Sequence, residues 1–226
     1  YGRILGLHIA AADPAADGSD PLETLKTTFA ERCERAGVTG ELAIGTGPIA
    51  HEIALRARWA DLVVAPLTFP PGADPLAKLK SGFRTIIVQS PCPVLAVPCA
   101  LFPVSRALLA YDGSQKSQEA LFVAAYLAAS WPEISLTVLT SHPDAEVADE
   151  RLESARTYLA KCGIEAELLA LSRTDVAEAI REEADSRDAS LILMGGYGSG
   201  PLLEVVLGST VNEVLRHTRR PTLICH

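Results

Sequence analysis

Glycine and hydroxyl residues gather in one stretch of the chain, Leu191–Thr210. An apolar run is followed by the letters GGYGSG at residues 195–200, and a second break at Gly208-Ser209-Thr210 precedes a helical pattern. Glycines let a ligand approach the main chain, whose N–H groups can then converge on an anion. A helix that begins at Ser209 adds unpaired N–H groups and the positive end of its dipole. The stretch therefore suits the binding of phosphate.

The spacing separates this stretch from other phosphate loops. No lysine follows the glycines as in a Walker A loop, and the order GxGxxG is missing. The spacing is instead Gly195-x2-Gly198-x9-Gly208-Ser209, and in this pattern the chain resembles the universal stress protein family. The resemblance implies that ATP, or AMP or ADP, binds here, with or without Mg²⁺. The phosphate ligands that it implies are Gly195, Gly198, Gly208, Ser209 and Thr210.

Two further positions complete the site that the resemblance implies. The letters AYDGS at residues 110–114 match the end of the family's first strand, which places Asp112 near the adenine and ribose. The main chain of Ser141 takes the position that recognises the adenine edge, although the family usually has His-Val where this chain has Thr140-Ser141. From the residues alone, Asp112 and Ser114 can equally cap the following helix, because Asp-Gly is a common turn.

Alternating strands and helices surround these motifs. Apolar runs predict strands, and apolar spacing with turn signals predicts helices of roughly 10–15 residues. The expected strands are 4–9, 41–44, 61–65 and 93–97, then 107–110, 136–140, 166–171, 191–194 and 222–225. The expected helices are 21–37, 48–59 and 77–90, then 117–130, 148–162 and 175–185, with one more from residue 209 or 210. This order predicts an α/β fold with doubly wound parallel sheets.

The order of elements repeats, which predicts two domains in one chain. We expect a first domain at residues 1–98, a linker at 99–105 and a nucleotide-binding domain at 106–226. The first copy lacks the opening strand and helix of the second, and we expect that unit to precede Tyr1. The resemblance also implies that the copies form a pseudo-dimer, with Pro93–Val97 beside Thr222–Cys225, and this pairing would hide two sheet edges.

The first copy has lost the glycine pattern. Pro66 and Phe69 stand in the places of Gly195 and Gly198, and Lys80 stands in that of Gly208, whereas Ser81 remains opposite Ser209. Proline has no N–H to donate to a phosphate. The first half is therefore predicted to be a degenerate copy without a phosphate site of this type.

Composition sets the class of protein. The chain of 226 residues is 48% hydrophobic with a net charge of −8, which argues against a nucleic-acid partner. Its longest apolar runs end well before the ~18 residues that a membrane span needs. The 5 cysteines are scattered without metal-ligand spacing, as in a cytoplasmic protein with reduced thiols.

The function that the resemblance implies is stress response or signalling through a bound adenine nucleotide. Neither a positioned base nor a metal set is evident, so we expect at most weak ATPase activity or self-phosphorylation of Ser209. The alternative is an interaction or scaffold module of the same fold that holds no nucleotide. Assembly is expected as a homodimer or as the pseudo-dimer within one chain, and the sequence does not indicate a protein partner.

Overall fold

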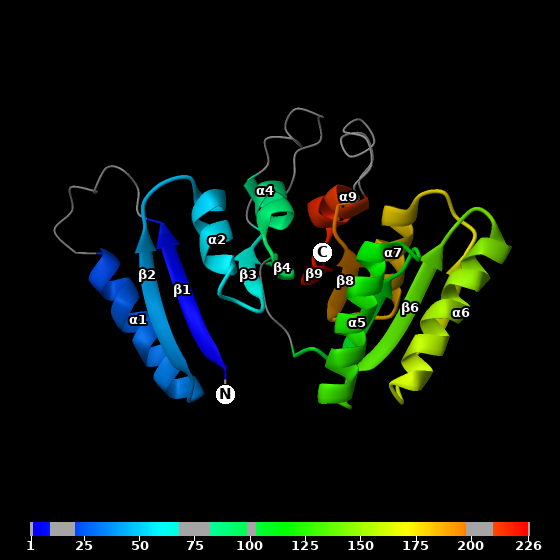
Figure 1. Ribbon diagram of the computed structural model, residues 1–226, viewed down its shortest axis with the longest axis horizontal. Helices are drawn as coiled ribbons and strands as arrows, with labels where there is room; N and C mark the ends of the chain where they lie inside the picture. The colour runs from blue at the N-terminus through cyan, green and yellow to red at the C-terminus, as the bar shows by residue number, and fades with distance from the viewer. Residues whose placement is uncertain (1, 10–20, 68–81, 99–102, 198–209, 226) are drawn as a thin grey trace. The chain divides into compact units, whose positions relative to one another are not determined.

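The computed structural model describes residues 2–9, 21–67, 82–98, 103–197 and 210–225 (Figure 1). The chain divides into two compact units, Tyr1–Arg56 and Ala57–His226. Each unit has its own sheet, in which most or all strand pairs are parallel. No helix in the described ranges is long and apolar enough to cross a membrane.

The first unit is a small layer of helix on sheet. Strand β1 (Arg3–Ile9) pairs in parallel with β2 (Thr39–Gly45), and the helices are α1 (Pro21–Ala36) and α2 (Ile49–Ala57). Helix α1 lies close to both strands, since a Cβ added to Gly6 would meet the Phe29 ring at 2.7 Å. One added to Gly40 would clash with the sulfur of Cys33. The two glycines therefore make room for the apolar side of α1.

The second unit is built on a sheet of seven strands among the described residues. In spatial order they are β3 (Val63–Pro66), β4 (Val94–Val97), β9 (Thr222–Cys225), β8 (Leu191–Gly195), β5 (Arg106–Ala110), β6 (Ser135–Ser141) and β7 (Glu167–Leu171). The pair β4–β9 is antiparallel and the other pairs are parallel. The helices are α4 (Gly82–Gln89), α5 (Gln115–Ser130), α6 (Ala145–Lys161), α7 (Val176–Ser186) and α9 (Thr210–His217).

Both faces of the central strands are buried, which explains their unbroken apolar runs. On β5, Leu109 belongs to the cluster that packs against α5 and α6, and its neighbour Leu108, on the other face, is 1% exposed. On β8, Leu193 lies in the same cluster, and Ile192 is fully buried on the other face. The α/β fold with parallel strands that the sequence predicts is confirmed.

The antiparallel pair joins the last strand of each repeat, as predicted. Val94 lies opposite Ile224 and Ala96 opposite Thr222, and all four residues are fully buried. Strands β3 and β4, from the first repeat, thus share one sheet with the strands of the second repeat. The division at residues 1–98, 99–105 and 106–226 remains a prediction, and part of the predicted linker lies outside the described residues.

Matching hydrogen bonds support the alignment of the two repeats. The N–H of Leu67 donates to Val97 across 2.7 Å, and the N–H of Gly196 donates to Cys225 across 2.6 Å. Pro66 therefore ends β3 as Gly195 ends β8, which is the correspondence expected from the sequence. Phe69, Lys80 and Ser81 lie outside the described residues.

Helix starts differ from the expected ones because side chains cap them earlier. Helix α5 begins at Gln115 rather than at residue 117, since the hydroxyl of Ser114 accepts from the N–H of Ser117 across 3.2 Å. Helix α6 begins at Ala145 rather than at residue 148, since the carboxylate of Asp144 accepts from the N–H of Glu146 across 3.0 Å. Both are ordinary N-caps. Of the helix expected at 77–90, residues 77–81 lie outside the described part.

The end of β8 touches the first turn of α5. A Cβ added to Gly195 would lie 2.7 Å from the carbonyl carbon of Lys116 and 2.7 Å from the nitrogen of Ser117. These are main-chain atoms in a helix, so they cannot move aside as the end of a flexible side chain can. Glycine at 195 is therefore required by packing as well as suited to a ligand site.

Replacing Gly195 by alanine should lower the free energy of unfolding by about 1–3 kcal/mol, because the methyl group overpacks the contact with α5. Urea unfolding followed by circular dichroism measures this change. Gly82→Ala is the matched control, since a Cβ there meets nothing within 4 Å at the start of α4. That variant should be as stable as the parent or slightly more stable. Equal stability of the two variants would contradict the close approach of β8 and α5.

Ile224→Ala should lower the free energy of unfolding by about 2–5 kcal/mol, because a fully buried side chain leaves a cavity in the shared sheet. Val64→Ala on β3 is the comparison, since Val64 is 58% exposed and should change stability by less than ~1 kcal/mol. Thermal melts of the two variants give the difference. Similar losses would mean that the β4–β9 pair is not the buried centre of the sheet.

Candidate functional site

The carboxyl ends of β5 and β8 meet where the order of strands reverses. From β5 the chain continues through β6 to β7, and it then returns to the other side of β5 with β8 and β9. Ala110 is paired with Met194, so the loops after β5 and β8 start side by side. In open α/β sheets, ligands bind at such a switch point. The structure thus brings Asp112 and Gly195 to the same edge of the sheet.

Asp112 follows β5 in a tight turn. Its carboxylate accepts from the N–H of Ser114 across 2.9 Å, and Gly113 has a positive φ of 77° that favours glycine. Partial desolvation raises the pKa of the carboxyl group, but hydrogen bonds from Ser114 and Ser117 outweigh it, so the pKa lies below 3.8. Asp112 is therefore ionised at neutral pH and exposed, while it also supports the start of α5.

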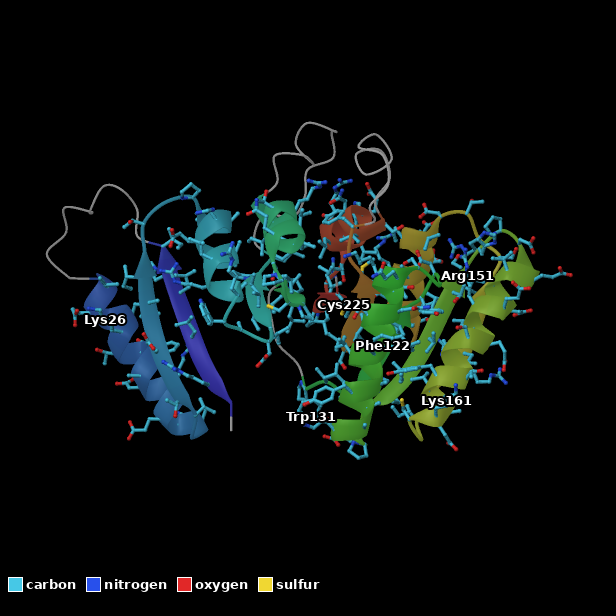
Figure 2. The ribbon with its side chains drawn as sticks, viewed as in Figure 1. Lys26, Phe122, Trp131, Arg151, Lys161 and Cys225 are labelled. Atoms are coloured by element: carbon cyan, nitrogen blue, oxygen red, sulfur yellow. The ribbon has the colours of Figure 1, made fainter. Side chains whose placement is uncertain are left out.

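An arginine from α6 stands over this turn. A Cβ added to Gly113 would lie 3.2 Å from the Cγ of Arg151 and 3.7 Å from its Nε. The positive charge of Arg151 also contributes to the lowered pKa of Asp112. Arg151 lies at the amino-terminal end of α6 (Figure 2). The turn after β5 thus offers one carboxylate with one guanidinium close by.

The end of β6 is fixed against β5. The hydroxyl of Thr140 is buried and donates to the carbonyl of Tyr111 across 2.7 Å. The N–H of Tyr111 donates to Leu139, so the main chain of Leu139 faces β5. Since main-chain groups alternate along a strand, those of Ser141 also face the β5 side. They lie two residues beyond the last β5–β6 pair, which is Ala110 with Leu139.

The structure describes two of the five predicted phosphate ligands, Gly195 and Thr210. Gly195 ends β8, and Thr210 is the first residue of α9 and is half-buried. Gly198, Gly208 and Ser209 lie outside the described residues.

Tyr197 is the last described residue before Gly198, and residues of two helices, α9 and α4, contact it. Its hydroxyl donates to the Oδ1 of Asn212 on α9 across 2.6 Å. The guanidinium of Arg84 on α4 lies 5.1 Å from the centre of its ring. Burial raises the pKa of Tyr197, and this outweighs the opposite effect of the charge on Arg84. The hydroxyl therefore stays protonated and keeps its hydrogen bond.

The groups at this edge are suited to binding a ligand rather than to catalysing its conversion. It combines an ionised carboxylate, main-chain groups at the ends of β6 and β8, and the first turn of α9. Among the described residues no group of three or more His, Cys, Asp or Glu could hold a metal ion. The nearby thiol of Cys225 is buried, which with a smaller effect of Glu119 raises its pKa to about 12, so it is not a nucleophile.

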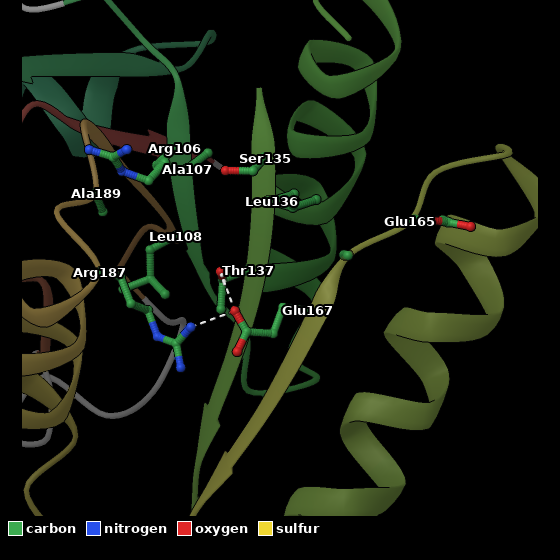
Figure 3. A pocket seen from close by; sticks show the side chains of 11 residues that line it. Arg106, Ala107, Leu108, Ser135, Leu136, Thr137, Glu165, Glu167, Arg187 and Ala189 are labelled. Carbon is green, nitrogen blue, oxygen red and sulfur yellow. Dashed lines mark hydrogen bonds and ion pairs between the residues drawn. The ribbon is translucent and has the colours of Figure 1, made fainter. Parts of the chain in front are cut away.

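A hollow of about 540 Å³ lies at the opposite, amino-terminal end of the strands (Figure 3). Apolar side chains at its floor, such as Leu108, are flanked by Arg187 and Glu167. These two charged groups form an ion pair, and Thr137 donates to the same carboxylate oxygen across 3.3 Å. The charges at this hollow are thus satisfied by one another, and none of the sequence-predicted site residues lines it.

Sequence reasoning missed the contacts of Arg84, Arg151 and Tyr197. The tyrosine stands inside the glycine pattern, but its partner on α4 lies in the other repeat. The position of Arg151 in the first two turns of α6 was readable, but its approach to Gly113 depends on the packing of α6 beside β5 and β6. No local spacing signals either contact.

Three comparisons with known proteins agree with this architecture. The model of the universal stress protein family matches residues 103–226, more than half of the chain. Universal stress protein Slr1230 of Synechocystis is 34% identical over 149 residues, which are 64% of this chain and 50% of that protein. The chain therefore spans about half the length of this curated relative.

Two solved structures share the fold over nearly the whole chain. A universal stress protein from Archaeoglobus fulgidus has a TM-score of 0.79 at 23% identity and covers 100% of this chain and 86% of its own. A putative universal stress protein from Pseudomonas aeruginosa has a TM-score of 0.67 at 20% identity. The match covers 99% of this chain and 81% of that protein's chain. Together with the match of the family model, the strand order and the glycine pattern lead to one conclusion. The chain belongs to the universal stress protein family.

Proposed function

We propose that the second half of the chain binds ATP, or AMP or ADP, at the carboxyl ends of β5, β6 and β8, and acts in cytoplasmic stress response or signalling. The observation that carries the proposal is the reversal of strand order between β5 and β8, which sets the Asp112 turn beside the end of β8. Membership of the family and the intact glycine pattern in this half support it.

At the adenosine end, Asp112 would accept hydrogen bonds from the ribose hydroxyls. An exposed carboxylate with a lowered pKa is ionised and accepts such bonds strongly. The main chain of Ser141 would recognise the adenine edge. Its groups face β5 beyond the last strand pair, and a main-chain contact does not need the histidine and valine usual in the family.

At the phosphate end, Gly195, Gly198, Gly208, Ser209 and Thr210 would bind the nucleotide. The first turn of α9, which starts at Thr210, supports this assignment, because the N–H groups and dipole of a helix start attract anions. Mg²⁺ would be held by the phosphates with few protein ligands, since none of the described acidic groups is gathered into a metal site.

A second function is favoured by the first repeat. Pro66 ends β3 where Gly195 ends β8, so this copy of the fold lacks an N–H where the other copy has one. Without the phosphate site, this copy would act as an interaction module. The whole chain would serve as a scaffold without nucleotide if the second site were also inactive.

Mass spectrometry of the ligand released from freshly purified protein, with calorimetric titration of ATP and Mg²⁺, tests the proposal. We expect one adenine nucleotide per chain. The double variant Gly198→Val with Ser209→Ala should abolish binding and leave the thermal melt unchanged, whereas Ser81→Ala in the first repeat should bind as the parent does. Two nucleotides per chain would overturn the prediction that the first half is inactive. No released ligand and no heat would favour the scaffold.

Asp112→Asn separates the two roles of this residue. Asparagine also accepts the N–H of Ser114, so we expect unfolding free energy to fall by less than ~1 kcal/mol. Affinity for the nucleotide should fall about tenfold, because the charge-assisted bonds are lost. Asp149→Asn, an exposed carboxylate on α6, is the control for the change in charge. Equal affinity of the two variants would restrict Asp112 to its role in the turn before α5.

The dependence of stability on pH follows from the same carboxylate. Its pKa in the folded protein lies below the unfolded value of 3.8. The charge therefore stabilises the fold above that pH, and this contribution is lost as the pH falls through the folded-state pKa. In urea unfolding, the difference between the parent and Asp112→Asn should be constant from neutral pH to about pH 5 and should disappear in more acidic solution.

A further inference from the structure

Arg84 reaches the site of the second repeat from the first repeat. It lies on α4, and its guanidinium stands over the ring of Tyr197, the residue that directly precedes Gly198. Both residues belong to the same compact unit. The contact therefore ties a helix of the degenerate half to the start of the glycine loop.

Arg84 and Asn212, which both contact Tyr197, occupy equivalent positions in the two repeats. In the frame that sets Ser81 opposite Ser209, Arg84 of α4 corresponds to Asn212 of α9. The ends of the two helices agree with this frame. The N–H of Ser90 donates to the carbonyl of Ile86 after α4, and the N–H of Thr218 donates to the carbonyl of Val214 at the equivalent positions after α9. Equivalent positions on the two helices thus hold the same tyrosine, Asn212 at its hydroxyl and Arg84 at its ring face.

The contacts around Tyr197 leave it little freedom. Asn212 is fully buried, so the hydrogen bond from the tyrosine hydroxyl is shielded from water. The neighbouring Gly196 donates its N–H to the last residue of β9. A cation over an aromatic ring adds an attraction that grows when the pair is shielded from solvent. The start of the glycine loop is therefore attached to α4, α9 and β9 at once.

We propose that Arg84 is a positioning residue for the nucleotide site, acting through Tyr197 to fix the start of the glycine loop. The inference rests on the proposed function of this site. The degenerate repeat then has a role in the intact one, because it supplies the cation that holds Tyr197 at the start of the loop. Thermodynamic reciprocity requires that the bound nucleotide in turn stabilises α4.

The variants Arg84→Gln and Arg84→Lys test the proposal by ATP calorimetry. Arg84→Gln should weaken binding roughly three- to tenfold, as expected for the loss of a partly shielded cation–aromatic contact. Arg84→Lys keeps a cation near the ring and should recover part of the affinity. Arg156→Gln, which removes an exposed arginine of α6, is the control and should bind as the parent does.

Variants of Tyr197 show whether Arg84 acts through the ring. Arg84→Gln should weaken binding in a Tyr197→Phe background, where the ring face remains, and should have no further effect in a Tyr197→Leu background. Thermal melts establish that each variant is folded, and the Phe variant carries the test if the Leu variant is not. Hydrogen exchange of α4 should slow on addition of ATP in the parent and not in Arg84→Gln, which a merely structural contact would not produce.

The outcomes separate the two proposals. If the parent chain binds no adenine nucleotide, the proposed function fails and the role of Arg84 fails with it. If the parent binds but Arg84→Gln binds equally well, only the role of Arg84 is overturned. If Arg84→Gln weakens binding equally with and without the ring of Tyr197, the arginine acts on the ligand directly, and the positioning role is wrong.

Discussion

The contact between the end of β8 and the first turn of α5 is the constraint on which the candidate site depends. Main-chain atoms of Lys116 and Ser117 approach Gly195 so closely that no side chain fits. This approach sets the turn after β5 beside the loop after β8, because α5 follows that turn directly. A residue with a side chain at 195 would push α5 away and with it Asp112. Gly195 thus has two functions. It lets β8 pack closely against α5, and it places no side chain over the main chain at the edge of the sheet.

The two ends of the sheet differ in how their charges are satisfied. At the amino-terminal end, Arg187 and Glu167 pair with each other, and Arg187 also pairs with Glu183. At the carboxyl end, Asp112 is ionised and its hydrogen bonds come from the turn that it caps, while Arg151 interacts with it only through its charge. A ligand that arrives at the carboxyl end meets groups that remain able to bind it. At the other end it would have to compete with ion pairs that are already formed.

The sequence predicts the order of elements, because this order depends on apolar runs and on the repeat, and the family resemblance implies the pairing of the last strands. The strand at 222–225 is found at those residues, and its antiparallel partner is the one expected. Helix starts were expected two or three residues late, although Ser114 and Asp144 were visible as caps. Contacts such as Arg84 with Tyr197 join residues more than a hundred positions apart and leave no periodic signal. For the candidate site, the sequence therefore indicates which residues to consider, but their approach to one another depends on packing.

The antiparallel β4–β9 pair lies within one chain, and this changes how the protein can evolve. In a homodimer the same interface would carry each substitution twice, once in each subunit. Here the two partners are encoded separately, so one copy can lose its glycines while the other keeps them. The association is also independent of protein concentration, because covalent linkage holds the partners at a fixed effective concentration. Asymmetric change of the two copies would thus leave the altered copy permanently attached to the other.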